Sequence, residues 1–296
     1  MHFHIHHRLS YRYERPVFLE PMVLRLTPRQ DSSQRLVRRE LRLQAPPSGL
    51  SRVLEPDGNV VEVAWFDHSR EALTVELELV VETLRTNPFD WILTRAGTRS
   101  LPMQYSPEES RSLAPCLGGE IPANVQEWAA ALAAEVEGST TGFLMHLADR
   151  IHHGFHHIGR LDGAPMAPAE TLASRTGACR DTAMLYVAAC RSQGLAARFV
   201  SGYSMHHPEE VTEHELHAWA EVYLPGGGWR AYDPSLGLAV ADGHVTLAAA
   251  PDHLLAAPVS GSYRGTGVGS QLEYAVTVQA AESLLELEAL ASEVPN

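Results

Sequence analysis

A regular alternation of apolar and polar side chains runs through the first 85 residues of the chain. In the segment 73–82, Leu73, Val75 and Leu77 lie on one face of an expected strand, and Glu76 and Glu78 lie on the other. The segment 3–13 repeats this period of two. Such a period places alternate side chains on opposite faces of a strand. The pattern therefore predicts an antiparallel β-sandwich or curled sheet.

The hydrophobic period changes after residue 123. From there the apolar residues recur every three or four positions, which predicts helices, and then alternate again, which predicts further strands. The expected helices are 125–136, 143–155 and 178–193, and the expected strands are 196–203, 217–224, 229–233 and 272–278. Residues 86–122 are rich in Pro, Gly and Ser and are expected to be a connection. We predict an α+β protein with two domains, a β-rich N-terminal domain over 1–120 and a second domain over 121–296.

Composition excludes several classes of function. The net charge of −13, without a basic stripe, argues against a nucleic-acid partner. The chain has no apolar run long enough for a transmembrane helix, and its first residues do not resemble a secretory signal. Its three cysteines, Cys116, Cys179 and Cys190, predict neither a disulfide framework nor a zinc knuckle, because no C-x-x-C pair is present. We expect a cytoplasmic protein with no membrane partner.

One of these cysteines lies where a reactive thiol is expected. Gly177 ends a loop, and the helical pattern begins directly after it, so Cys179 falls in the first turn of a helix. Free backbone N–H groups and the positive end of the helix dipole stabilise a thiolate at that position. Arg180 adds positive charge nearby, and Asp181 partly offsets it. A buried structural cysteine is the alternative, which the position alone leaves open.

A histidine and an aspartate flank a predicted hairpin. In the segment 217–224, apolar residues alternate with His217, Trp219, Glu221 and Tyr223, which predicts that His217 leaves the sheet on a polar and aromatic face. The turn 225–228 then returns the chain toward Asp233. Cross-strand neighbours on a diagonal lie within about 8 Å of each other. A carboxylate at this distance can orient an imidazole and stabilise its protonated form.

These residues belong to runs that together resemble a known family, the transglutaminase-like core of bacterial proteins. The runs are 177–181, 190–203, 217–225, 228–229 and 233–235, and the segments 11–13 and 16–17 resemble the β-rich region that often precedes this core. The resemblance implies a papain-like fold, in which a helix bearing the cysteine packs against an antiparallel sheet. It also implies that Cys179 is the nucleophile, His217 the base and Asp233 the residue that orients the base.

The implied chemistry is thiol-dependent acyl transfer at an amide bond of a peptide or protein, through a thioester. We favour a cysteine peptidase or amidase. Two alternatives stay open: a protein-glutamine transglutaminase, and a catalytically silent binding module of the same fold. The backbone N–H of Cys179 is an expected donor to the oxyanion of the tetrahedral intermediate.

The remaining candidates are weaker. Trp219 and His214 are candidate substrate contacts, because the charged, histidine-rich segment 205–215 is expected to border the cleft. Histidines at 152, 153, 156 and 157 have the i, i+4 spacing that can bind zinc, but no H-E-x-x-H motif accompanies them, and we expect an exposed histidine-rich helix face. We predict no cofactor and no required metal. Cys190 is expected in the core, and Cys116 receives no role.

Overall fold

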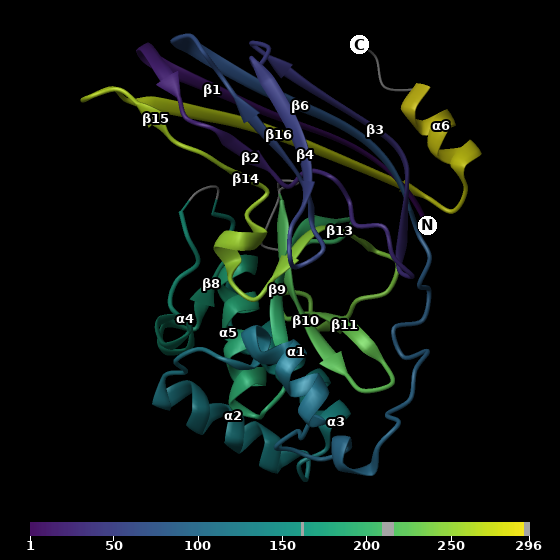
Figure 1. The fold of residues 1–296 in the computed structure, drawn as a ribbon. Helices are drawn as coiled ribbons and strands as arrows, with labels where there is room; N and C mark the ends of the chain where they lie inside the picture. Colours follow the sequence, from purple (N-terminus) through teal and green to yellow (C-terminus); the bar gives the residue numbers. More distant parts are fainter. Residues whose placement is uncertain (161–162, 209–215, 293–296) are drawn as a thin grey trace.

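The computed structural model describes residues 1–160, 163–208 and 216–292 (Figure 1). The N-terminal part consists of long antiparallel strands, as the period of two predicts. Their bounds are β1 (His2–Leu19), β2 (Met22–Leu24), β3 (Gln34–Gln44), β4 (Gly49–Leu54), β5 (Val60–Trp65) and β6 (Arg70–Thr83). Strands β1, β6 and β3 are neighbours in one sheet, and β2, β5 and β4 are neighbours in a second.

The end of the chain returns to these N-terminal sheets. Strand β16 (Ser270–Ala281) pairs antiparallel over its whole length with residues 2–13 of β1. Two short strands, β14 (Val259–Ser260) and β15 (Tyr263–Arg264), pair with β2 and β1. The division into domains 1–120 and 121–296 stays a prediction, but the pairing shows that residues 259–281 complete the N-terminal sheets. Helix α6 (Leu284–Ser292) follows β16.

A third sheet, which is antiparallel and has five strands, lies at the centre of the other half, in the order β12-β11-β10-β9-β13. Its strands are β9 (Ala197–Ser204), β10 (His217–Leu224), β11 (Gly228–Asp233), β12 (Leu238–Ala239) and β13 (His244–Ala250). Helix α5 (Cys179–Ser192) packs against this sheet, and Leu185, Tyr186 and Ala189 share a core with Ala220 and Val222 of β10. The predicted α+β fold, with a cysteine-bearing helix against an antiparallel sheet, is confirmed.

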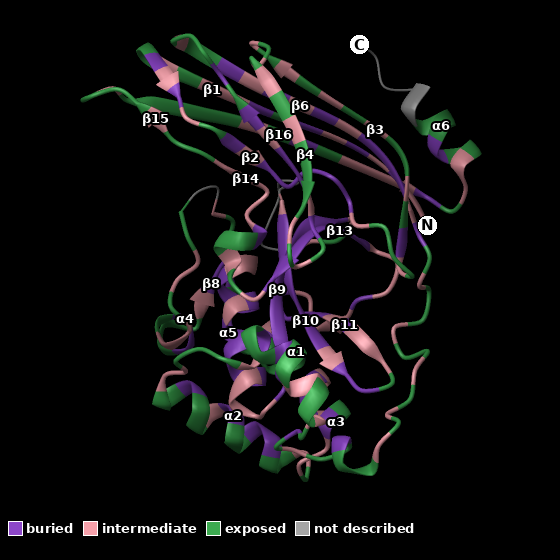
Figure 2. Ribbon diagram, viewed as in Figure 1, coloured by how far each residue is buried: buried purple, intermediate pink, exposed green. Residues whose placement is uncertain are grey.

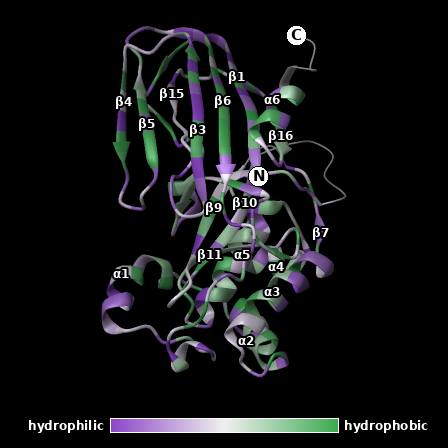
Figure 3. Ribbon diagram, turned by 90° about the vertical axis from the view of Figure 1, so that its right-hand side faces the viewer, coloured by the Kyte–Doolittle hydropathy of each residue, from purple (hydrophilic) through white to green (hydrophobic). Residues whose placement is uncertain are grey.

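The remaining helices lie around α5, on the side of the molecule away from the N-terminal sheets (Figures 1 and 3). They are α1 (Pro107–Leu117), α2 (Ala123–Glu135), α3 (Thr140–Gly154) and α4 (Pro168–Ser174). The short elements are η1 (Ala96–Thr98), β7 (His156–His157), β8 (Thr176–Gly177) and η2 (His253–Ala256). Ser139 caps α3 by accepting the N–H of Gly142 at 3.2 Å. None of the helices in the described ranges is long and apolar enough to cross a bilayer.

Helix α1 was not predicted, because residues 86–122 were interpreted as a connection. The sequence carried its signal in a capping box. Ser106 accepts the backbone N–H of Glu109, the Glu109 carboxylate accepts the N–H of Ser106, and Pro107 occupies the first helical position. The abundance of Pro and Ser in this segment therefore marked the start of a helix.

The central strands are buried on both faces, which corrects the prediction for β10. His217, Trp219 and Glu221 lie on the face that was predicted to be polar and aromatic and distinct from the core face, but all three are at most 5 % exposed. Figure 2 shows that β9 and β10 are mostly buried along their length. The cover comes from the N-terminal part, because Arg29 bonds to Glu221 and the Gln34 side chain bonds to Thr246 of β13. A residue on this strand therefore lies between two layers, as in a central strand of an α/β protein.

Candidate active site

Cys179 occupies the first position of helix α5, where the sequence placed it. The helix start is held by Asp181, whose completely buried carboxylate accepts the backbone N–H of Ala178 at 2.8 Å. The Cys179 side chain is half-buried, whereas Cys116 and Cys190 are buried. Burial raises the pKa of both Cys116 and Cys190, well above the ordinary value for Cys190. Cys179 is therefore the cysteine that a substrate can reach.

Asp181 also fixes the loop that precedes the helix. Its second carboxylate oxygen accepts the Arg160 guanidinium at 2.6 Å and the backbone N–H of Met166 at 2.8 Å. The negative charge beside Cys179 is thus paired with Arg160, so it opposes a thiolate less than the sequence alone suggested. A side chain at Gly177 would stand 2.9 Å from the Asp181 Cβ, which explains the glycine before the reactive position.

His217 and Asp233 meet across the hairpin of β10 and β11. Ala220 pairs with Tyr232, so Asp233 lies diagonal to His217, as predicted. The His217 Nε2 atom is 2.6 Å from Asp233 Oδ2. Asp233 Oδ1 accepts the N–H and the hydroxyl of Ser235 at 2.9 and 2.7 Å. The carboxylate is completely buried, and its hydrogen bonds hold it in one orientation.

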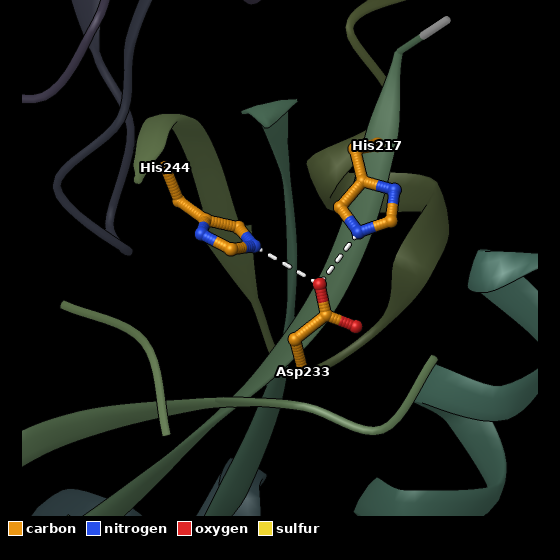
Figure 4. A group of neighbouring side chains, drawn as sticks. All are labelled: His217, Asp233 and His244. Atoms are coloured by element: carbon orange, nitrogen blue, oxygen red, sulfur yellow. Dashed lines mark hydrogen bonds and ion pairs between the residues drawn. The ribbon is translucent and has the colours of Figure 1, made fainter. Parts of the chain in front are cut away.

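A second histidine that the sequence analysis missed binds the same carboxylate oxygen. His244, at the start of β13, places its Nε2 atom 2.9 Å from Asp233 Oδ2, so both rings point at one atom (Figure 4). No motif surrounds His244, and only the pairing of β13 with β9 brings it here. Its ring also lies 5.0 Å from the ring of Trp219, at a steep angle.

The two histidines have opposite electrostatic states. Burial lowers the pKa of His244, and this effect exceeds the attraction of Asp233. Burial also opposes a charge on His217, but the Asp233 carboxylate, followed by the Cys179 thiol, outweighs it and raises the pKa of His217 to about 10. Burial would raise the pKa of Asp233, yet His217 and His244 hold it well below its ordinary value. The group therefore combines a carboxylate with an imidazolium on one side and a neutral imidazole on the other.

Cys179 and His217 line one cavity of about 400 Å³. The thiol acts on His217 both through its charge and through a hydrogen bond. Because Nε2 of His217 is bound to Asp233, the nitrogen available to the thiol is Nδ1. The structure thus brings together the three side chains that the sequence singled out, in the order thiol, imidazole and carboxylate.

His217, Asp233 and His244 form the one group of three or more potential metal ligands in the described ranges. Two ligand atoms on a tetrahedral zinc stand about 3.4 Å apart, given metal–ligand distances near 2.1 Å. Here the two histidine nitrogens stand 2.6 and 2.9 Å from the same carboxylate oxygen. These are hydrogen-bond lengths, so the arrangement fits a hydrogen-bonded cluster better than a metal site. That the protein needs no metal stays a prediction.

The other predicted site residues lie elsewhere. Trp219 is completely buried beneath the site, because β10 is covered on both faces, and this position does not favour the predicted substrate contact. His214 lies outside the described residues. The prediction of one exposed histidine-rich helix face is wrong, because α3 ends at Gly154 and His157 lies in β7. His157 is buried, and its Nε2 atom contacts the His152 carbonyl at 3.1 Å. His152 Nδ1 in turn contacts the Ser235 carbonyl at 2.8 Å.

Comparison with known proteins defines the class of this fold and site. Residues 130–234 match the family model of the transglutaminase-like superfamily, and residues 3–82 match that of the bacterial transglutaminase-like N-terminal region. The two models together span more than half of the chain. The chain therefore belongs to the transglutaminase-like superfamily, and this confirms the predicted resemblance.

Individual relatives cover almost the whole chain. An uncharacterized protein of Mycobacterium leprae is 27% identical, over 88% of this chain and 92% of its own length. An uncharacterized protein of Mycobacterium tuberculosis is 26% identical, over 93% of this chain and 92% of its own. A crystal structure from Cytophaga hutchinsonii, described as "a Putative Cysteine Protease", has a TM-score of 0.69 at 19% identity and covers 96% of this chain and 92% of that one. The likeness in structure establishes the fold.

Proposed function

We propose that this chain is a cysteine peptidase or amidase, with Cys179 as nucleophile, His217 as acid and base, and Asp233 as the residue that orients His217. One observation carries the proposal. The accessible cysteine of the chain lies at a helix N-terminus in the same cavity as an imidazole, and a buried carboxylate holds the far nitrogen of that imidazole. The description of the Cytophaga hutchinsonii protein as a cysteine protease supports the same chemistry.

The reaction begins with attack of the Cys179 sulfur on the carbonyl carbon of an amide. Because its pKa is raised to about 10, His217 already holds the thiol proton on Nδ1 at neutral pH. It gives this proton to the leaving amine, and a thioester is left on the cysteine. Water then attacks the thioester while His217 takes its proton. The carboxylic acid leaves, and the thiol is restored. The charge of Asp233 stabilises the imidazolium that forms in both halves, which agrees with the raised pKa of His217.

The position of the thiol also supports the proposal. The first N–H groups of a helix have no partner within the helix and can donate to an oxyanion. The N–H of Cys179, at the first helical position, is suitably placed to stabilise the tetrahedral intermediate. The transglutaminase alternative differs only in the acceptor, since an amine would attack the thioester in place of water.

Thiol labelling tests the mechanism without a known substrate. We expect iodoacetamide to alkylate Cys179 rapidly near neutral pH, and we expect His217→Ala to slow this reaction by at least about tenfold, because the thiol loses its proton acceptor. His68→Ala removes a histidine whose side chain is 82% exposed, far from the site, and serves as the control. Equal labelling in the wild type and His217→Ala would favour the catalytically silent binding module.

A peptide-library screen tests the reaction itself. We expect amide hydrolysis that disappears in Cys179→Ala and falls by about 10²–10⁴-fold in His217→Ala, the range of general acid–base catalysis. Adding a primary amine to the assay distinguishes a peptidase or amidase from a transglutaminase. Amide products in place of free acid would support the transglutaminase, and hydrolysis that survives Cys179→Ala would overturn the mechanism.

A further inference from the structure

The cavity beside Cys179 has an unusual lining for so acidic a chain. The chain carries 36 acidic residues and a net charge of −13. No carboxylate side chain contributes to the cavity wall among the residues that the structure describes, and the groups there that can carry charge are Arg180, His217 and His253. Most of the remaining wall is aliphatic or aromatic. The described part of this wall favours an apolar group and holds no carboxylate to pair with a cation.

One wall of this cavity comes from the N-terminal sheet. On β1 and β16, Leu9 pairs with Tyr274 and Tyr11 pairs with Leu272, and all four side chains line the cavity. They lie at alternate positions along each strand, so they share one face of the sheet. The same face of β1 carries Phe3 and Ile5, which are completely buried in the core.

The apolar face of the sheet therefore extends beyond the core that covers it. Along β1, Phe3, Ile5 and Leu9 are buried, whereas Tyr11 is only partly buried, and Leu272 opposite Tyr11 is 48% exposed. The uncovered end of this face stands over the cavity that holds Cys179. Exposed apolar surface of this kind commonly marks a binding site.

The other half of the molecule also contributes apolar side chains to the wall. Phe199 and Ala218 of the central sheet are buried there, and Leu254 of η2 stands at the rim with 63% exposure. The hydroxyl of Ser201 is already used, since it donates to the Ala256 carbonyl at 2.6 Å. The Ser201 hydroxyl therefore has no free proton to donate to a polar substrate group. The cavity volume of about 400 Å³ is ample for a large side chain.

We propose that this cavity is a subsite for a bulky apolar side chain, of the size of Leu or Phe, next to the amide bond that Cys179 attacks. The proposal rests on the proposed function and adds the substrate class. It also gives the N-terminal sheet a role, because that sheet supplies the Leu9–Tyr274 and Tyr11–Leu272 pairs of the wall. Pockets of this kind discriminate between side chains by about 10–200-fold for small differences in apolar size.

Halomethyl ketones of blocked amino acids test this selectivity, because the sulfur displaces the halide and forms a thioether with the label. We compare the rates at which the phenylalanine, alanine and arginine labels modify Cys179, each divided by the iodoacetamide rate of the same protein. We expect the phenylalanine label to react at least about tenfold faster than the alanine label, and the arginine label to show no advantage. Leu254→Glu, at the rim, should reduce the preference for phenylalanine severalfold.

A matched control is Leu54→Glu, because Leu54 is 71% exposed and lies outside the cavity. It should keep the wild-type selectivity. Rapid iodoacetamide labelling without a preference for phenylalanine would overturn the subsite and leave the proposed function intact. Equal loss of selectivity in Leu54→Glu would also overturn the subsite, because the effect would not be local.

A second measurement does not need a reactive thiol. Titration calorimetry with N-acetyl-phenylalaninamide and the Cys179→Ala variant should give saturable binding, weakened at least threefold by Leu254→Glu and unchanged by Leu54→Glu. If labelling is slow but this binding is found, the proposed reaction fails and the apolar site stands. Absence of binding together with unselective labelling would end the proposal.

Discussion

A single buried carboxylate, Glu221, joins the N-terminal part of the chain to the central sheet. Its two oxygens accept Arg29 at 2.9 and 3.1 Å and the Nε atom of Arg198 at 2.8 Å. Burial alone would raise the pKa of Glu221, but the two guanidinium groups lower it from 4.5 to about 2. A difference of one in pKa corresponds to about 1.4 kcal/mol. The ionised carboxylate therefore contributes about 3 kcal/mol to the free energy of unfolding.

The substitution Glu221→Gln should remove this contribution. We expect a loss of about 3 kcal/mol near neutral pH, which agrees with the 3–5 kcal/mol typical when one partner of a buried ion pair is removed. The sign of the pH dependence follows from the lowered pKa. The stabilisation is complete above pH 4.5, the unfolded value, and is lost as the pH falls toward about 2. The difference in unfolding free energy between the wild type and Glu221→Gln should therefore decrease as the pH falls through this range.

Urea denaturation, followed by tryptophan fluorescence at a series of pH values, measures the difference in unfolding free energy between the wild type and Glu221→Gln. Glu135→Gln is the control, because Glu135 pairs with His146 at 2.7 Å but is 48% exposed, and we expect a loss below about 1 kcal/mol. A Glu221→Gln variant within about 1 kcal/mol of wild type at neutral pH would refute the reasoning. A difference in unfolding free energy that stays constant as the pH falls to about 2, the pKa of Glu221 in the folded state, would also refute it.

Three further outcomes are expected. Steps that need a protonated His217 should persist through neutral pH and be lost as the pH rises through about 10, which a pH profile of kcat/KM would read. His244→Phe should lower kcat by at least about tenfold and alter the pH profile, because His244 positions the Asp233 carboxylate. His244→Gln retains an N–H donor and should keep much of the activity. Gly202→Ala should lower Tm, because the added Cβ would clash with the Val245 carbonyl oxygen. Gly97→Ala should leave Tm unchanged, because no atom lies within 4 Å of the added Cβ.

The site residues that were predicted from the sequence are all positioned by short local patterns. Cys179 follows a loop glycine at a helix start, and His217 and Asp233 are the first and last residues of two hairpin strands. Each of these positions depends on a periodic pattern a few residues long, so a single sequence carries the signal. The hairpin then fixes the diagonal between the imidazole and the carboxylate without any long-range contact.

The features that were missed depend on distant parts of the chain. His244 reaches Asp233 only because β13 pairs with β9, on the far side of β10. Helix α5 covers one face of β10, and the N-terminal part covers the other through Arg29, almost 200 positions earlier in the chain. The alternation within β10 does not encode that second cover. Likewise the alternating segment 272–278 predicted a strand, but the spacing of its residues does not encode the pairing of that strand with β1.

Stability and catalytic geometry are joined on one strand. Glu221 lies on the same face of β10 as His217, four residues further along, with Trp219 between them. Arg29 holds Glu221 from the N-terminal part, and Arg198 holds it from the neighbouring strand β9. The sheet that supplies the apolar wall is therefore anchored to the strand that carries the imidazole. Loosening that anchor would shift the wall relative to the thiol, so the N-terminal sheet acts as part of the site as well as its cover.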